Sequence, residues 1–99
     1  MKTVIINGCE YKLAYNLRSL FVYEEITGKP YTGTKTKDNY YLMFAMLYAN
    51  NEGIDMSFEE FIDACDVDFG LFEAFTEVVE AYGKRINAYQ ENKKKAATQ

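Results

Sequence analysis

An asparagine–glycine pair at residues 7 and 8 constrains the fold of this chain more than any other feature. Both central residues of a type I′ turn need a positive φ, and Asn-Gly is the pair that favours this turn between two strands. The turn pairs Ile6 with Cys9 and predicts a β-hairpin over residues 3–13. Ile5 breaks the alternation of the first strand. One face of the hairpin gathers the other apolar side chains: Val4, Ile6, Cys9, Tyr11 and Leu13.

A two-stranded hairpin alone is marginally stable in water, so helices must cover its apolar face. Helical patterns occur at about residues 17–27, 38–50, 58–65 and 69–92. A chain of 99 residues, 48% of them hydrophobic and 26% charged, suits one globular domain. We therefore expect an α+β fold that is mostly α, with the N-terminal β-hairpin packed on a bundle of about four helices. The single domain would cover residues 1–92 and be followed by a flexible basic tail over 93–99.

Capping residues mark most of the expected helix ends. Asn16 is the predicted N-cap of the first helix, and Gly28 ends that helix in the left-handed conformation. Asp38 is the predicted N-cap of the second helix. Ser57 and Glu60 form a capping box at the start of the third helix.

Two of the predicted helices are apolar on both sides. This pattern places helix 17–27 at the centre of the domain. For helix 38–50 we favour burial between two layers. The alternative is one core face and one adaptable partner-binding face that carries Met43 and Met46.

The last predicted helix carries an apolar row spaced at alternating intervals of three and four residues. The first half of the row should pack on the hairpin and the first helix. The second half outruns the domain, so we expect a partner surface there, together with Met43 and Met46. Alternatively, the helix bends at Gly83 and folds back onto its own core. The row consists of Phe72, Phe75, Val79, Tyr82, Ile86 and Tyr89, of which Tyr82, Ile86 and Tyr89 form its second half.

Residue usage disfavours catalysis. The chain has no histidine, which excludes Ser-His-Asp, Cys-His and histidine-based zinc chemistry. Cys9 and Cys65 have no CxxC spacing and lie on apolar stripes, so we expect buried, reduced thiols. The chain has no glycine-rich phosphate loop. We therefore expect no catalytic, cofactor-binding or metal-ligating residue and no enzymatic activity.

Charge is distributed very unevenly along the chain. Residues 38–82 contain eleven acidic residues and no Lys or Arg, whereas residues 1–37 carry a net charge of +3 and residues 83–99 of +4. The acidic block would repel a phosphate backbone, so nucleic-acid binding is not expected. Opposite charges on different parts of the chain favour a homo-oligomer joined head to tail.

We expect no contact with a membrane. The longest apolar run, residues 40–49, is half the length of a bilayer-spanning helix of roughly 20 residues. Residues 2–6 lead directly into the Asn-Gly turn, so we expect no secretory signal and an intracellular protein.

Three segments together resemble the tail assembly chaperones of long-tailed phages and prophages with non-contractile tails. They are Ile5–Leu13 (IINGCEYKL), Asn16–Pro30 (NLRSLFVYEEITGKP) and Met56–Asp63 (MSFEEFID). The resemblance extends over most of the chain, to about the end of the fourth predicted helix. Its specificity comes from the three segments in this order.

The resemblance implies a non-enzymatic role in building a phage tail. Proteins of this family bind the tape measure protein, recruit tail tube subunits around it, and are absent from the finished particle. The expected location is therefore the host cytoplasm. The alternative is a structural or interaction subunit of a phage or prophage particle, such as a tail completion or head–tail joining protein.

Overall fold

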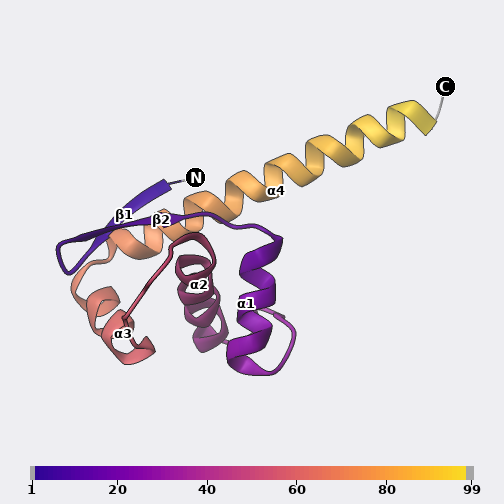
Figure 1. Cartoon of the computed structure of the whole chain (residues 1–99). Helices are drawn as coiled ribbons and strands as arrows, with labels where there is room; N and C mark the ends of the chain where they lie inside the picture. The colour runs from indigo at the N-terminus through magenta and orange to yellow at the C-terminus, as the bar shows by residue number, and fades with distance from the viewer. Residues whose placement is uncertain (1, 98–99) are drawn as a thin grey trace.

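The computed structural model describes residues 2–97 and shows an N-terminal hairpin followed by four helices (Figure 1). Strands β1 (Lys2–Ile6) and β2 (Cys9–Leu13) pair antiparallel, with Ile6 opposite Cys9. Asn7 and Gly8 have φ values of 52° and 79°, as a type I′ turn requires. The expected α+β fold, mostly α, is confirmed, and so is the register of the hairpin.

The helices are α1 (Leu17–Thr27), α2 (Thr36–Asn50), α3 (Phe58–Val67) and α4 (Gly70–Ala97). Helix α4 extends five residues beyond its predicted end. The predicted flexibility of residues 93–99 stays a prediction, because the side chains of 93–97 and all of residues 98–99 lie outside the described part of the chain.

Local capping explains where most helices begin. The Asn16 carboxamide oxygen accepts a hydrogen bond from the Ser19 amide at 2.9 Å, and the Ser57 hydroxyl accepts one from the Glu60 amide at 3.1 Å. The N-cap assigned to Asp38 is wrong. The N-cap is Lys35, three residues earlier, and it makes no side-chain hydrogen bond. Asp38 lies in the first turn of α2 instead, where its buried carboxylate pairs with Lys29 rather than with the helix N-terminus.

The core is built around α2, as the two-sided apolar pattern predicts. Six consecutive side chains, Leu42 to Leu47, are buried. From α3, the ring of Phe58 stacks on Tyr41 with centroids 3.9 Å apart, and Phe61 is fully buried beside Phe44. Helix α2 therefore lies between layers.

The prediction that α1 is central is wrong. Helix α1 packs against α2, and its buried residues are Ser19 and Tyr23. The side chains of Leu17 and Phe21 are 62% and 54% exposed. One side of α1 faces α2, and among the described residues the opposite side keeps apolar side chains at the surface.

Helix α4 covers the hairpin with its first half and continues well past the other elements (Figure 1). Lys2 and Glu77 form an ion pair between β1 and α4. Near the start of α4, the rings of Phe72 and Tyr40 lie 6.2 Å apart. The overhanging helix lengthens the molecule to 52 Å, against 27 and 25 Å along the other two axes.

Asn50 and Asn51, at the end of α2, connect the helices to the hairpin through side-chain hydrogen bonds. The Asn51 carboxamide donates to the Lys12 carbonyl and accepts from the Lys12 amide, both at 2.8 Å. The Asn50 carboxamide donates to the carbonyl of Ala14 at 3.0 Å and accepts from the Asn16 side chain at 3.0 Å. These bonds satisfy backbone groups of β2 and of the link to α1 that no strand pairs.

Candidate interaction surfaces

The first candidate surface is the outer half of α4. Tyr82 is half-buried because its ring lies 4.6 Å from that of Tyr15, in the link between β2 and α1. Ile86 is 39% exposed and Tyr89 is 65% exposed. Helix α4 is continuous through Gly83, so the alternative in which the chain folds back at this glycine does not occur. The second half of the predicted row therefore lies on a helix that extends beyond the domain (Figure 1).

Met43 and Met46 do not belong to any surface. Their exposed fractions are 2% and 0%, and both lie in the core formed around α2. Their assignment as partner-binding residues is wrong, because other elements already enclose α2: α1 packs along it, and Phe72 and Phe75 of α4 lie beside Met43.

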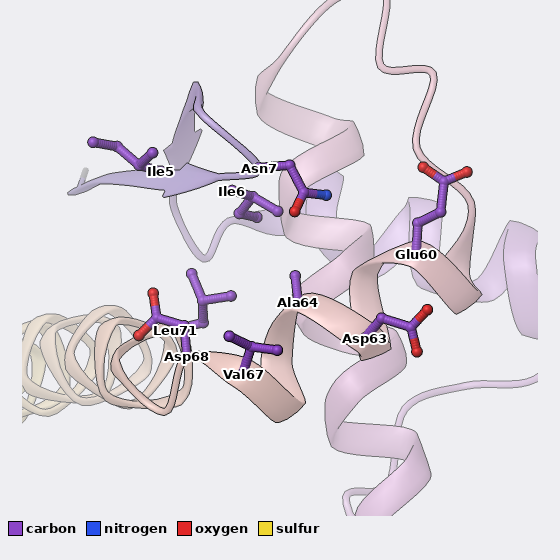
Figure 2. A pocket seen from close by; sticks show the side chains of 9 residues that line it. All are labelled: Ile5, Ile6, Asn7, Glu60, Asp63, Ala64, Val67, Asp68 and Leu71. Atoms are coloured by element: carbon purple, nitrogen blue, oxygen red, sulfur yellow. The ribbon is translucent and has the colours of Figure 1, made fainter.

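A second candidate surface is the groove between the hairpin and α3 (Figure 2). Residues of β1 and its turn form one side, and residues of α3 and the start of α4 form the other. Its volume is about 340 Å³, at the low end of the range for protein binding pockets. The apolar lining comes from Ile5, Ile6, Ala64, Val67 and Leu71, and the polar lining from Asn7, Glu60, Asp63 and Asp68. We call this surface the hairpin–α3 groove.

Two apolar side chains of the hairpin–α3 groove are largely open to solvent. Val67 is 89% exposed and Ile5 is 65% exposed. Sequence reasoning missed the groove because its two sides are more than fifty residues apart. The available signals were the unalternated Ile5 and the isolated Val67 between two aspartates. Neither Ile5 nor Val67 fits the apolar pattern that predicts the core.

The three carboxylates of the hairpin–α3 groove make the lining acidic. Asp68 accepts a hydrogen bond from the Gly70 amide at 2.9 Å, and Glu60 lies beside the Ser57 hydroxyl. Within residues 2–92, whose side chains the structure describes, the ion pairs are Lys2–Glu77 and Lys29–Asp38. None of the three carboxylates in the groove is therefore paired with a cation from this part of the chain.

A third candidate surface lies where α1 begins beside the end of α2. Leu17 and Phe21 are its exposed apolar side chains, and Arg18 is adjacent. The hollow between these residues and Asn50 has a volume of about 530 Å³. We call it the α1 surface.

A polar cluster lies under the loop between α1 and α2. Asp38 is 5% exposed, and the Lys29 ammonium lies 3.4 Å from its carboxylate. The ring of Tyr31 meets that of Tyr23 edge to face at 5.3 Å, and the Tyr31 hydroxyl donates to Asn39. The Tyr23 hydroxyl is buried and has no hydrogen-bond partner among the described residues. Burial raises the pKa of Tyr23, and the Asp38 carboxylate adds to the shift.

The two cysteines are not the fully buried thiols that the sequence predicts, and they differ from each other in exposure. Cys9 is exposed, so its assignment to the core is wrong: it follows the turn directly, at the end of the hairpin. Cys65 is half-buried, and burial raises the pKa of its thiol to about 11, with smaller contributions from Asp66 and Asp68. A thiol with a raised pKa is a poor nucleophile at neutral pH.

Between residues 2 and 97, no cluster of three or more His, Cys, Asp or Glu side chains is arranged to hold a metal ion. None of the helices described over the same residues is long and apolar enough to cross a bilayer. The surfaces that stand out in the described part of the chain are the outer half of α4, the hairpin–α3 groove and the α1 surface.

Comparisons of the chain with protein-family models, with curated proteins and with solved structures found no match.

Proposed function

We propose that this protein is a non-enzymatic tail assembly chaperone of a long-tailed phage or prophage, acting in the host cytoplasm. In this role it binds the tape measure protein and recruits tail tube subunits during tail assembly. Support comes from the resemblance in segments Ile5–Leu13, Asn16–Pro30 and Met56–Asp63. The exposed apolar side chains are consistent with it, since a chaperone needs surface to hold a partner.

The overhang of α4 is the observation that most favours a binding role. A helix whose apolar row continues past its own domain presents anchors at the spacing used when one helix docks against another. Within the described chain Tyr89 is 65% exposed and Ile86 is 39% exposed, so both retain apolar surface that a partner could cover. The α1 surface, with Leu17 and Phe21, offers a second place for a partner.

The direct test is co-purification with the tape measure protein encoded in the same genome. The wild-type chain should retain the tape measure protein. The matched variants Ile86→Ser/Tyr89→Ser and Leu17→Ser/Phe21→Ser each remove one apolar surface. Each of these side chains contributes about 1.5–3 kcal/mol when fully buried, so loss of the correct pair should weaken binding at least tenfold. Ala88→Ser/Glu91→Gln, on the opposite face of α4, is the control and should retain full binding.

If none of these variants weakens binding to the tape measure protein, the assignment of these surfaces is contradicted. No binding by the wild-type chain would contradict the proposed function itself. The composition of purified particles distinguishes the chaperone from the alternative, a structural subunit such as a tail completion or head–tail joining protein. A chaperone is absent from finished particles, and a structural subunit is present.

A further inference from the structure

We infer that the outer half of α4 of one copy docks into the hairpin–α3 groove of a second copy, so that copies join head to tail. This inference concerns contacts between copies of the chain and does not rest on the proposed function.

The two surfaces have complementary chemistry. The hairpin–α3 groove combines exposed apolar side chains, Ile5 and Val67, with three carboxylates that no cation of residues 2–92 neutralises. The outer half of α4 combines Ile86 and Tyr89 with Arg85, which lies within about 100° of both around the helix. An apolar pair flanked by a cation thus matches an apolar lining flanked by carboxylates.

The charge distribution along the whole chain favours the same contact. The groove carboxylates belong to the block over residues 38–82, which has eleven acidic and no basic residues. The segment that would dock belongs to residues 83–99, with a net charge of +4. Attraction between the two blocks would orient an approaching copy before contact.

The occupant of the groove cannot be the α4 of the same molecule. Leu71, at the start of α4, lines the groove, whereas Ile86 lies fifteen residues further along the same continuous helix. At 1.5 Å per residue this is about 22 Å, and an unbroken helix cannot fold back onto its own first turn. Figure 1 shows α4 extending away from the hairpin and α3. An outer half of α4 that lies in this groove must therefore come from a second copy.

A contact between two different surfaces of the same chain does not close on itself in a dimer. It produces a ring if the rotation between copies closes and an open filament if it does not. The α1 surface is used by neither side of the contact, so it remains open to another protein.

Two matched variants, each with one surface blocked, test the contact. Asp63→Lys/Val67→Lys alters only the groove, at two exposed positions of α3. Arg85→Glu/Tyr89→Glu alters only the overhang and keeps good helix formers. Circular dichroism and thermal unfolding check that each is folded. If either double variant is unfolded, the corresponding single variant, Asp63→Lys or Arg85→Glu, is used in its place. A reducing agent is present throughout, since Cys9 is exposed.

Sedimentation equilibrium at low salt measures the mean mass of the wild-type chain, of each variant and of their mixture. The wild-type chain should increase in mean mass with concentration from its monomer mass of 11.4 kDa, and each variant alone should stay monomeric. A one-to-one mixture of the two variants should form a heterodimer and nothing larger, because only one intact groove and one intact overhang can meet. At 0.5 M salt the wild-type association should weaken several-fold, since exposed charges are then screened.

Three results would overturn the inference. They are a wild-type chain that stays monomeric at low salt, a variant that associates as the wild type does, and a mixture of the two variants that stays monomeric. The second result would assign self-association to another surface, such as the α1 surface.

Discussion

At the scale of single residues, two tyrosines that touch each other illustrate how burial and hydrogen bonding act separately. Tyr23 is fully buried and its hydroxyl is unpaired within the described structure, whereas the hydroxyl of its neighbour Tyr31 donates to Asn39. The Tyr23 hydroxyl lies near Thr27 and Asp38 but makes a hydrogen bond of normal geometry with neither, so it does not recover the hydration that burial removes.

We expect Tyr23→Phe to stabilise the protein by about 1 kcal/mol, because it removes the unpaired hydroxyl and keeps the ring. Tyr31→Phe is the matched control and should destabilise by about 1 kcal/mol, because Asn39 then loses its donor. In a domain of this size each change corresponds to a shift in Tm of about 4–8 °C, upward for the first variant and downward for the second. Thermal unfolding measures both, and a lower Tm for Tyr23→Phe would show that its hydroxyl is satisfied.

The two thiols should react at very different rates. Cys9 is exposed, whereas Cys65 is half-buried with a pKa raised to about 11. Because a raised pKa lowers the thiolate fraction at any given pH, only about one Cys65 in a thousand is thiolate at pH 8. Iodoacetamide at pH 8 should therefore modify Cys9 first, and the rate at Cys65 should rise about tenfold per pH unit up to pH 11. Peptide mass spectrometry follows each site, and equal rates in the folded protein would contradict this assignment.

At the scale of elements, α4 shows that a glycine inside a helical pattern need not mark a bend or a close contact. Apart from its chain neighbours and the helix's own backbone, an added Cβ at Gly83 would have no atom within 4 Å, and the helix continues on both sides of it. The glycine therefore weakens the helix without any compensating contact in the monomer.

Gly83→Ala should stabilise the protein by up to about 1 kcal/mol, the difference in helix propensity between the two residues. Gly28→Ala is the contrasting variant, because Gly28 ends α1 with a φ of 74°, where an alanine is strained. It should destabilise the protein. Chemical denaturation gives both free energies. Destabilisation by Gly83→Ala would indicate that the helix bends at this glycine in solution.

At the scale of the whole molecule, the overhang of α4 determines the shape. A compact domain of 99 residues has a radius of gyration of about 13 Å. The Cα radius of gyration here is 15.2 Å, because α4 extends along the 52 Å axis.

Small-angle X-ray scattering of the monomer, recorded at high salt and low concentration, should give a radius of gyration of about 15 Å or slightly more. The distance distribution should have a tail that reaches about 50 Å. A value near 13 Å would mean that α4 folds back onto the domain. The variant Arg85→Glu/Tyr89→Glu is the control, because it should remain extended and monomeric even at low salt.

Short-range signals in the sequence were sufficient to predict the elements that depend only on neighbouring residues. The turn at Asn7-Gly8, the hairpin register, the Asn16 cap and the Gly28 end each depend on the conformations of a few neighbouring residues, and all are confirmed. The row on α4 was also predictable, because helical spacing alone places Ile86 and Tyr89 on one side.

Tertiary structure decided which apolar sides are covered. Periodicity shows that Leu17, Phe21, Met43 and Met46 belong to apolar sides of their helices, but both sides of α1 and of α2 qualified. Burial depends on which elements pack alongside, and α2 is enclosed whereas α1 is not. The hairpin–α3 groove likewise exists only because the fold brings β1 beside α3, a juxtaposition that no local pattern of residues encodes.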